Sequence, residues 1–235
     1  MEPKVELNKI QVRNESIGVV IYFTLYFTYL FFHLESEIGH WLSLVLIPFL
    51  ALTVYHRQVN TPFQNTLASF GIRKDNWTTG LGWALMLGLF VSVMQLFISG
   101  NATSFWEVVE SGKAFYLFPI VFLFLLFSAG FTEEFFFRGV LQTRLARYTG
   151  NKIVAVLITS ILFSLYHLPY TYLNPNWPSH GDLAAAFTAA FTNGMLGGII
   201  LGVVYEQTDR NLFASILVHS LINVFPAMTL IKFQA

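Results

Sequence analysis

The sequence predicts an all-α protein, a polytopic transmembrane helical bundle of about seven to eight helices. The chain is 55% hydrophobic and only 11% charged, whereas a soluble domain carries about 25% charged residues. Its mean hydropathy is +0.59, and its apolar runs are longer than the strands of a membrane barrel. Because helices satisfy their own backbone hydrogen bonds in lipid, helical spans are the expected structure.

Seven apolar runs approach the roughly 17–25 residues that cross a bilayer as a helix. We expect them to form one integral membrane domain over residues 1–235, with no appended soluble domain. The seven predicted spans are Ile17–Phe32, Trp41–Tyr55, Gly80–Ser99, Ala114–Phe137, Lys152–His167, Leu183–Tyr205 and Leu212–Ile231.

Each early element has its own sequence features. No small-residue cleavage pattern follows the first run, which we interpret as a retained helix and not as a signal peptide. The second run is short and contains Pro48, a candidate kink. The segment Pro62–Trp77 is a candidate interfacial stretch, and an eighth helix hidden there would invert all later spans. The fourth run is expected to continue as an amphipathic helix to Tyr148.

Lysine and arginine gather on one side of the predicted membrane. This side receives Lys4, Lys9, Arg13, Arg57, Arg73, Lys74, Arg144, Arg147, Lys152 and Arg210. The opposite side receives Lys113 and Lys232 beside Glu35, Glu37, Glu107, Glu110 and Asp182. Since cytoplasmic loops carry the excess of positive charge, the N-terminus is predicted to be cytoplasmic. The compact chain favours a prokaryotic plasma membrane, with the endoplasmic reticulum as the alternative.

Composition also excludes several classes of partner and site. The net charge is zero, so no basic surface predicts a nucleic-acid partner. The chain has no cysteine, which excludes disulfides, thiolate metal ligands and a cysteine nucleophile. The partners expected from composition alone are the lipids of the bilayer.

An ionisable cluster interrupts the fourth run at Glu133, Glu134 and Arg138. Each such group at membrane depth costs roughly 2.5–3.5 kcal/mol on insertion scales, so a functional role is expected. Residues four apart share a helix face, so Glu134 and Arg138 can pair, while Glu133 points about 100° away from Glu134. One carboxylate can therefore be neutralised while the other acts on a bound water. A purely structural ion pair near the helix end is the competing interpretation.

Two histidines can face this cluster. Glu133 lies 15 residues before the turn at Tyr148–Lys152 and His167 lies 15 residues after it, so both sit roughly 22 Å from the turn. His219 is only about 12 Å from the start of its helix by the same rise and reaches this level only if that helix tilts or starts earlier. By the four-residue spacing, Phe163 aligns with His167, and Asn223 with His219.

Three motifs resemble those of the CAAX protease and bacteriocin-processing family of intramembrane proteases, which includes the CAAX prenyl endopeptidases. They are Glu133-Glu-x-x-x-Arg138, Phe163-x-x-x-His167 and His219-x-x-x-Asn223, in that order on three late helices. The resemblance covers roughly residues 118–225. It implies a helical membrane fold with a conical, water-filled cavity reached from the cytosol, and an endopeptidase acting on a membrane-associated or lipidated, for example prenylated, protein or peptide.

The resemblance also implies roles for the motif residues. Glu133 would be the general base that activates water, supported by Glu134 and Arg138. His167 would assist that step, with Phe163 beside it, and His219 and Asn223 would stabilise the oxyanion. Members are often called metalloproteases, and Glu133, His167 and His219 would make a zinc set with water as the fourth ligand. We favour a mechanism that requires no cofactor, because Glu134 already faces Arg138; zinc is the alternative.

Two other functional classes fit the same residues. Intramembrane Glu, Arg and His form proton or ion relays in transporters, but transporters commonly show paired inverted halves, and here the polar residues all lie in the later half. A noncatalytic immunity or scaffold protein that keeps the fold is the other alternative. It predicts that Glu133→Ala leaves the phenotype intact.

Overall fold

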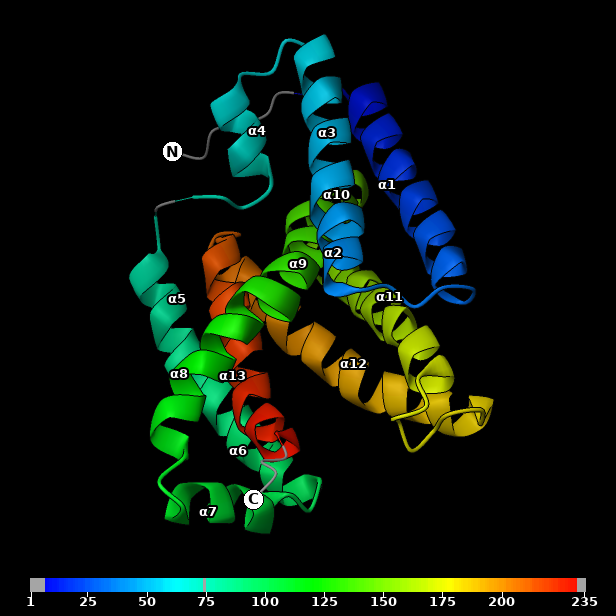
Figure 1. Cartoon of the computed structure of the whole chain (residues 1–235). Coiled ribbons are helices and arrows are strands. Elements are labelled where there is room, and N and C mark those ends of the chain that lie inside the picture. Colours follow the sequence, from blue (N-terminus) through cyan, green and yellow to red (C-terminus); the bar gives the residue numbers. More distant parts are fainter. Residues whose placement is uncertain (1–6, 74, 232–235) are drawn as a thin grey trace.

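The computed structural model describes residues 7–73 and 75–231, and Lys4, Lys74 and Lys232 of the charge pattern lie outside these residues. Across the described ranges the chain forms helices and no strands, which confirms the all-α prediction (Figure 1). The elements of the first half are α1 Lys9–Leu30, α2 Glu37–His40, η1 Trp41–Leu46, α3 Ile47–Gln58, α4 Phe63–Ser69, α5 Trp77–Trp83, η2 Ala84–Gly88, α6 Leu89–Ile98 and α7 Ala102–Glu110.

The second half forms one long helix and a set of three more. The elements are α8 Ala114–Leu125, η3 Leu126–Gly130, α9 Phe131–Glu134, η4 Phe135–Gln142, α10 Thr143–Thr149, α11 Lys152–Leu173, α12 Leu183–Gln207 and α13 Leu212–Leu230. The stretches labelled η are π-helical, and the long helix is kinked within η3, where Ser128 has non-helical backbone angles (φ -82°, ψ -108°). The predicted continuation of the fourth run is confirmed, because the helix ends only at Thr149, where Gly150 takes a left-handed φ of 65°.

Six helices of the described chain are long and apolar enough to cross a membrane. They are Glu37–Gln58, Trp77–Ile98, Ala114–Thr149, Lys152–Leu173, Leu183–Gln207 and Leu212–Leu230. These correspond to the second through seventh predicted spans. Within the described residues 62–73 and 75–76 of the candidate interfacial stretch, the chain forms the seven-residue helix α4, which is too short to be a further span.

The first predicted span differs from the other six. Helix α1 has 22 residues, but it is not among the helices long and apolar enough to cross a membrane. The physical reason is its polar first half, where Lys9, Arg13 and Glu15 replace the apolar residues that lipid requires. The first run is therefore a helix, as predicted, but a less apolar one than the other six.

A buried ion cluster attaches α1 to the rest of the bundle. The Oε1 atom of Glu15 lies 3.0 Å from Nε2 of His56 and accepts a hydrogen bond from Nε of Arg144 at 3.0 Å. Arg144 also donates to the backbone carbonyls of Ser69 and Gly139. Since Glu15, His56 and Arg144 are all buried, the cluster links α1, α3 and α4 to α10.

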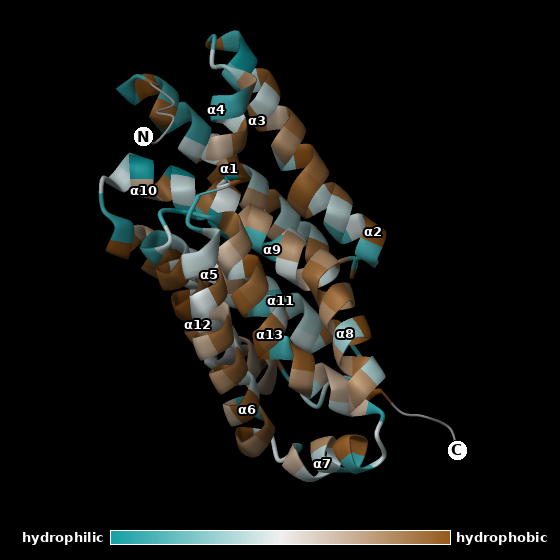
Figure 2. Cartoon of the chain, turned by 90° about the vertical axis from the view of Figure 1, so that its left-hand side faces the viewer, coloured by the Kyte–Doolittle hydropathy of each residue, from teal (hydrophilic) through white to brown (hydrophobic). Residues whose placement is uncertain are grey.

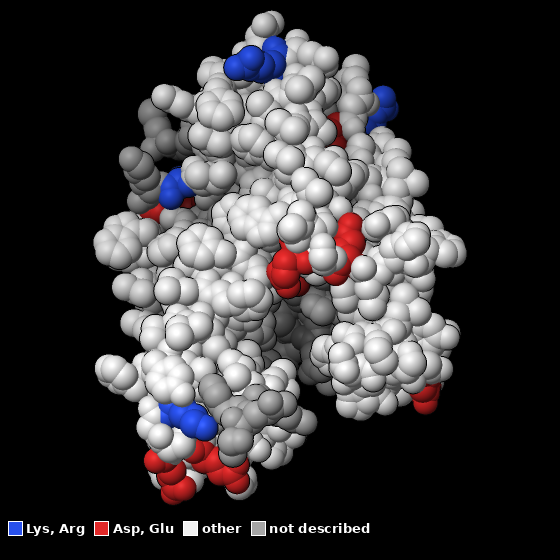
Figure 3. Space-filling view, in the orientation of Figure 1, with Lys and Arg blue, Asp and Glu red and all other residues white. Residues whose placement is uncertain are grey.

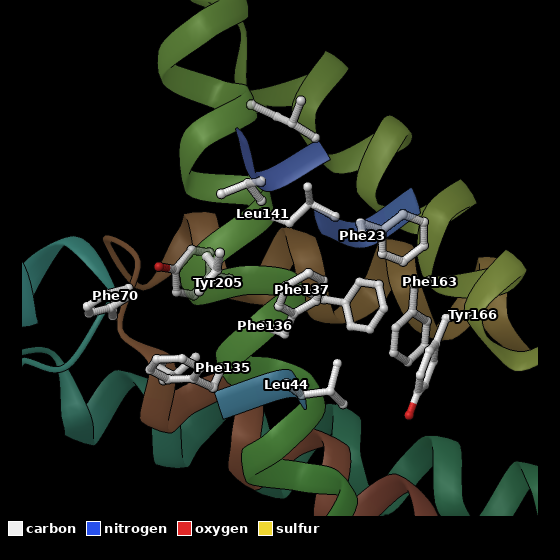
Figure 4. Packing of buried hydrophobic residues seen from close by; sticks show 14 of the residues in the cluster. Phe23, Leu44, Phe70, Phe135, Phe136, Phe137, Leu141, Phe163, Tyr166 and Tyr205 are labelled. Carbon is white, nitrogen blue, oxygen red and sulfur yellow. The ribbon is translucent and has the colours of Figure 1, made fainter. Parts of the chain in front are cut away.

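An aromatic core surrounds the centre of the long helix. Phe135, Phe136 and Phe137 are consecutive, and all three are buried. Figure 4 shows them pointing to different neighbours, among them Phe70 and Phe163. A helix that buries three adjacent side chains is surrounded on every side, so the segment that carries the glutamates occupies the middle of the bundle. Figure 2 shows that hydrophobic residues dominate the helices, while hydrophilic ones collect at the end with α4 and α10.

Small residues let α11 and α12 pack closely. A Cβ added to Gly194 would lie 2.8 Å from the Cα of Ser164, and one added to Gly198 would lie 2.9 Å from the Cα of Ser160. Close backbone approach through small residues is the usual way that membrane helices associate. At Gly197, in contrast, an added Cβ would meet nothing within 4 Å.

This contrast predicts opposite outcomes for two neighbouring glycines. Gly194→Ala should destabilise the protein by about 1–3 kcal/mol, because the new methyl group meets backbone that cannot rotate away. Gly197→Ala is the matched control and should leave stability unchanged. Thermal unfolding of both variants in the same detergent measures the difference, and an equally stable Gly194→Ala would contradict the close packing.

Candidate active site

Two adjacent glutamates lie on α9, near the middle of the long helix, and they face different partners. Glu134 is fully buried; its Oε1 lies 3.1 Å from Nη1 of Arg138 and 2.9 Å from Nδ1 of His219. The pairing with Arg138 is the one that the four-residue spacing predicts. Glu133 is 9% exposed and lines a cavity. The geometry therefore divides the pair into one neutralised and one accessible carboxylate.

The buried guanidinium of Arg138 connects three elements. Its Nη2 donates to the backbone carbonyl of Gly198 on α12 at 3.2 Å, and its Cζ stands 4.6 Å from the centre of the Phe163 ring on α11. The same ring meets His167 edge-on at 4.6 Å between centroids. Phe163 thus supports both the cation and the histidine, which is a packing role consistent with its place in the second motif.

Glu133 lies between two imidazoles. Its Oε2 is 3.9 Å from Nε2 of His167 and 3.9 Å from Nε2 of His219. These distances are too long for hydrogen bonds, and Oε2 has no hydrogen-bond partner among the described residues. A polar gap of this length is one that a water molecule can bridge. The sequence did not decide whether His219 reaches the level of Glu133. In the structure it does, because both histidines stand equally far from the same Glu133 oxygen.

A hydrogen bond at Nδ1 orients the ring of each of the two histidines. Nδ1 of His167 lies 2.8 Å from the carbonyl oxygen of Phe163, and Nδ1 of His219 lies 2.9 Å from the Glu134 carboxylate. Each of these partners accepts, so the proton of a neutral ring is assigned to Nδ1. The Nε2 atoms therefore turn toward Glu133, either as acceptors in neutral rings or as donors in charged ones.

The candidate zinc ligands have suitable chemistry but not a suitable placement. Two imidazole nitrogens and one carboxylate form a known catalytic zinc set. However, residues 7–73 and 75–231 contain no group of three or more His, Asp or Glu that could hold a metal ion. We therefore derive no step through a metal.

One cavity of about 540 Å³ is lined by residues from all three motifs. Asn223, one turn after His219 on α13, lines it together with Glu133, His167 and His219. Glu134 and Arg138 lie behind this wall and do not line it. Gln95, near the end of α6, also lines the cavity, although none of the three motifs contains it. No local signal marks Gln95, because its position depends only on how α6 packs beside α13.

Comparison with protein families identifies the segment that carries the site. Residues 115–225 match the family model described as type II CAAX prenyl endopeptidase Rce1-like. This segment contains all three motifs, and the match confirms the resemblance predicted from them. Comparisons with curated proteins and with solved structures gave no match.

Proposed function

Since residues 115–225 match the family model described as type II CAAX prenyl endopeptidase Rce1-like, we propose that this protein cleaves a peptide bond of a membrane-associated protein or peptide with Glu133 as the general base. The observation that supports this proposal is the position of Glu133. It is the carboxylate that faces the cavity, between two imidazoles at 3.9 Å, while Glu134 is occupied by Arg138 and His219.

The proposed reaction begins with a water molecule held by Glu133 and by neutral His167. Glu133 takes one proton as the water oxygen attacks the carbonyl carbon of the scissile bond. The tetrahedral intermediate carries a negative oxygen, to which Asn223 and charged His219 donate hydrogen bonds. Glu134 supports the charged ring through Nδ1. Glu133 then returns its proton to the leaving nitrogen, and the C–N bond breaks to give an acid and an amine.

The proposal includes a membrane location and an orientation. The six spans and the family match support an integral membrane protein. The concentration of lysine and arginine at one end supports a cytoplasmic N-terminus, and we assign the protein to a prokaryotic plasma membrane. No cofactor is required in this scheme, and Glu133, His167 and His219 would be the ligands if zinc took part.

A cleavage assay on detergent-purified protein tests the reaction. A panel of farnesylated and unmodified peptides is incubated with the wild type and with Glu133→Ala, each with and without a zinc chelator. We expect cleavage by the wild type in both conditions and none by the variant. Loss of activity with chelator would overturn the cofactor-free scheme, and an active variant would overturn the assignment of the base.

Asn223 offers a separate test of the oxyanion step. Asn223→Ala should lower kcat by about 10²–10³-fold, the usual effect of removing one oxyanion donor, with little change in KM. Asn101→Ala is the control, because Asn101 also lines the cavity but belongs to none of the motifs. An equal fall in kcat for both variants would contradict a specific role for Asn223.

A further inference from the structure

A second cavity, the α1–α10 cleft, lies away from the active site between the first half of α1 and the end of α10. The two helices pack together there, because the hydroxyl of Ser16 donates to the backbone carbonyl of Arg144 at 3.1 Å. Lys9, Arg13 and Arg147 line this cleft, which has a volume of about 500 Å³. No aspartate or glutamate of the described residues lines it. The cleft therefore concentrates positive charge, and none of the three motifs contributes to it.

The charge of Arg147 is not fully balanced by the nearby Glu15. The Oε1 atom of Glu15 already accepts a hydrogen bond from Arg144 at 3.0 Å, whereas its Oε2 atom stands 3.8 Å from Nη1 of Arg147. This distance is too long for a hydrogen bond, and Nη1 has no hydrogen-bond partner in the described part of the chain. Two guanidinium groups thus share one buried carboxylate, which leaves an excess positive charge at the wall of the cleft.

The other lining residues suit an amphiphilic ligand. Lys9 and Arg13 are exposed on α1 and form no ion pair with a described carboxylate. Beside these cations the side chains of Ile10 and Tyr148 also line the cleft, and they are 63% and 54% exposed. An exposed tyrosine next to cations is typical of the headgroup level of a membrane. Cations for a negative headgroup and apolar surface for the chains below it therefore occur in one cleft.

Helix length places the α1–α10 cleft at the depth of the headgroups. The helix that ends with α10 runs over Ala114–Thr149 and has 36 residues, a contour length of about 54 Å. This exceeds the roughly 40–45 Å of a bilayer with its headgroups, so the end of α10 reaches the membrane surface. Figure 3 shows most of the visible lysine and arginine groups in the upper half of the molecule, where α1 begins (Figure 1). In the proposed orientation this end meets the cytoplasmic leaflet, whose anionic lipids attract basic segments.

We propose that the α1–α10 cleft binds one anionic phospholipid, with phosphatidylglycerol as the simplest example. Lys9, Arg13 and Arg147 pair with the phosphate oxygens, while Ile10 and Tyr148 contact the glycerol and the first methylene groups of the acyl chains. Basic pockets between membrane helices on the cytoplasmic side bind anionic headgroups in this way. Because α10 continues the helix that carries the active-site glutamates, the bound lipid holds α1 against that helix. The inference goes beyond the proposed function and does not depend on it.

Two double variants that lose the same charge test the site. Lys9→Gln/Arg13→Gln removes the two exposed cations of the cleft. Arg57→Gln/Lys152→Gln removes two exposed cations that do not line it, at the same end of the molecule. Each protein is purified in a neutral detergent and titrated with phosphatidylglycerol, with phosphatidylcholine of the same acyl chains, or with inorganic phosphate. Native mass spectrometry counts the bound lipids, and thermal unfolding measures the stabilisation.

We expect the wild type to bind one phosphatidylglycerol saturably and to unfold at a higher temperature with this lipid than with phosphatidylcholine. Lys9→Gln/Arg13→Gln should bind phosphatidylglycerol about 30-fold more weakly, which corresponds to about 2 kcal/mol for the two cations together. Arg57→Gln/Lys152→Gln should bind it as the wild type does.

Four results would overturn the proposal. Equal effects of the two lipids on the wild type would exclude selection by charge, and this comparison is valid even if a variant fails to fold. Unchanged affinity in Lys9→Gln/Arg13→Gln would exclude the cleft. An equal loss in both double variants would indicate general attraction to the basic end and no defined site. Equal stabilisation by inorganic phosphate would assign the cleft to a free anion and not to a lipid.

Discussion

Glu133→Gln should lower kcat by at least about 10²–10⁴-fold, the contribution of a positioned general base, and leave the fold intact. The amide has the shape of the carboxyl group but takes no proton from water. Because Oε2 of Glu133 has no hydrogen-bond partner among the described residues, its replacement breaks no bond that holds the bundle together. Peptide cleavage gives kcat, and thermal unfolding in detergent gives the stability.

Two matched variants separate this role from general effects of charge. Glu107→Gln removes an exposed carboxylate on α7 and should retain full activity. Glu134→Gln removes the counterion of Arg138 and should lower stability as well as activity, because a buried cation is left unpaired. If Glu133→Gln unfolded as readily as Glu134→Gln, the two glutamates would not have the separate roles that the geometry assigns to them.

Glu15→Ala should destabilise the protein by about 3–5 kcal/mol, which is the cost of leaving a buried charge without its partner. Arg144 would keep its bonds to the carbonyls of Ser69 and Gly139 but lose its buried carboxylate. Helix α1 would lose its polar attachment, since Glu15 links it to both His56 and Arg144. Thermal unfolding measures the loss, with Glu107→Ala as the exposed control. An unfolding temperature near that of the wild type would contradict the proposed attachment.

The same cluster predicts a dependence on pH. Burial by itself would raise the pKa of Glu15, but Arg144, His56 and Arg147 outweigh burial and lower it to about 2. A lowered folded-state pKa stabilises the fold above the ordinary value near 4.5, and this stabilisation is lost as the pH falls from there toward 2. Unfolding measured over this range should show a smaller pH dependence in Glu15→Gln than in the wild type.

Local sequence signals predicted much of the structure because they depend on short distances along the chain. Apolar runs marked six spans correctly, and the four-residue spacing predicted the ion pair of Glu134 and Arg138. For the first run, such local signals were not sufficient to predict the structure. Its apolar second half suggested a span, but the polar residues before it make bonds to α3 and α10 that no local pattern reveals.

The sequence alone determined that this protein is a helical membrane chain without cysteine. It also determined the motif residues, which are two glutamates, an arginine, two histidines and an asparagine in three motifs. Only the tertiary structure decided that both Nε2 atoms stand 3.9 Å from the same Glu133 oxygen. The reason is physical. Periodicity fixes which residues share one helix face, but the contact between faces depends on tilt and on close approaches such as Gly194 against Ser164.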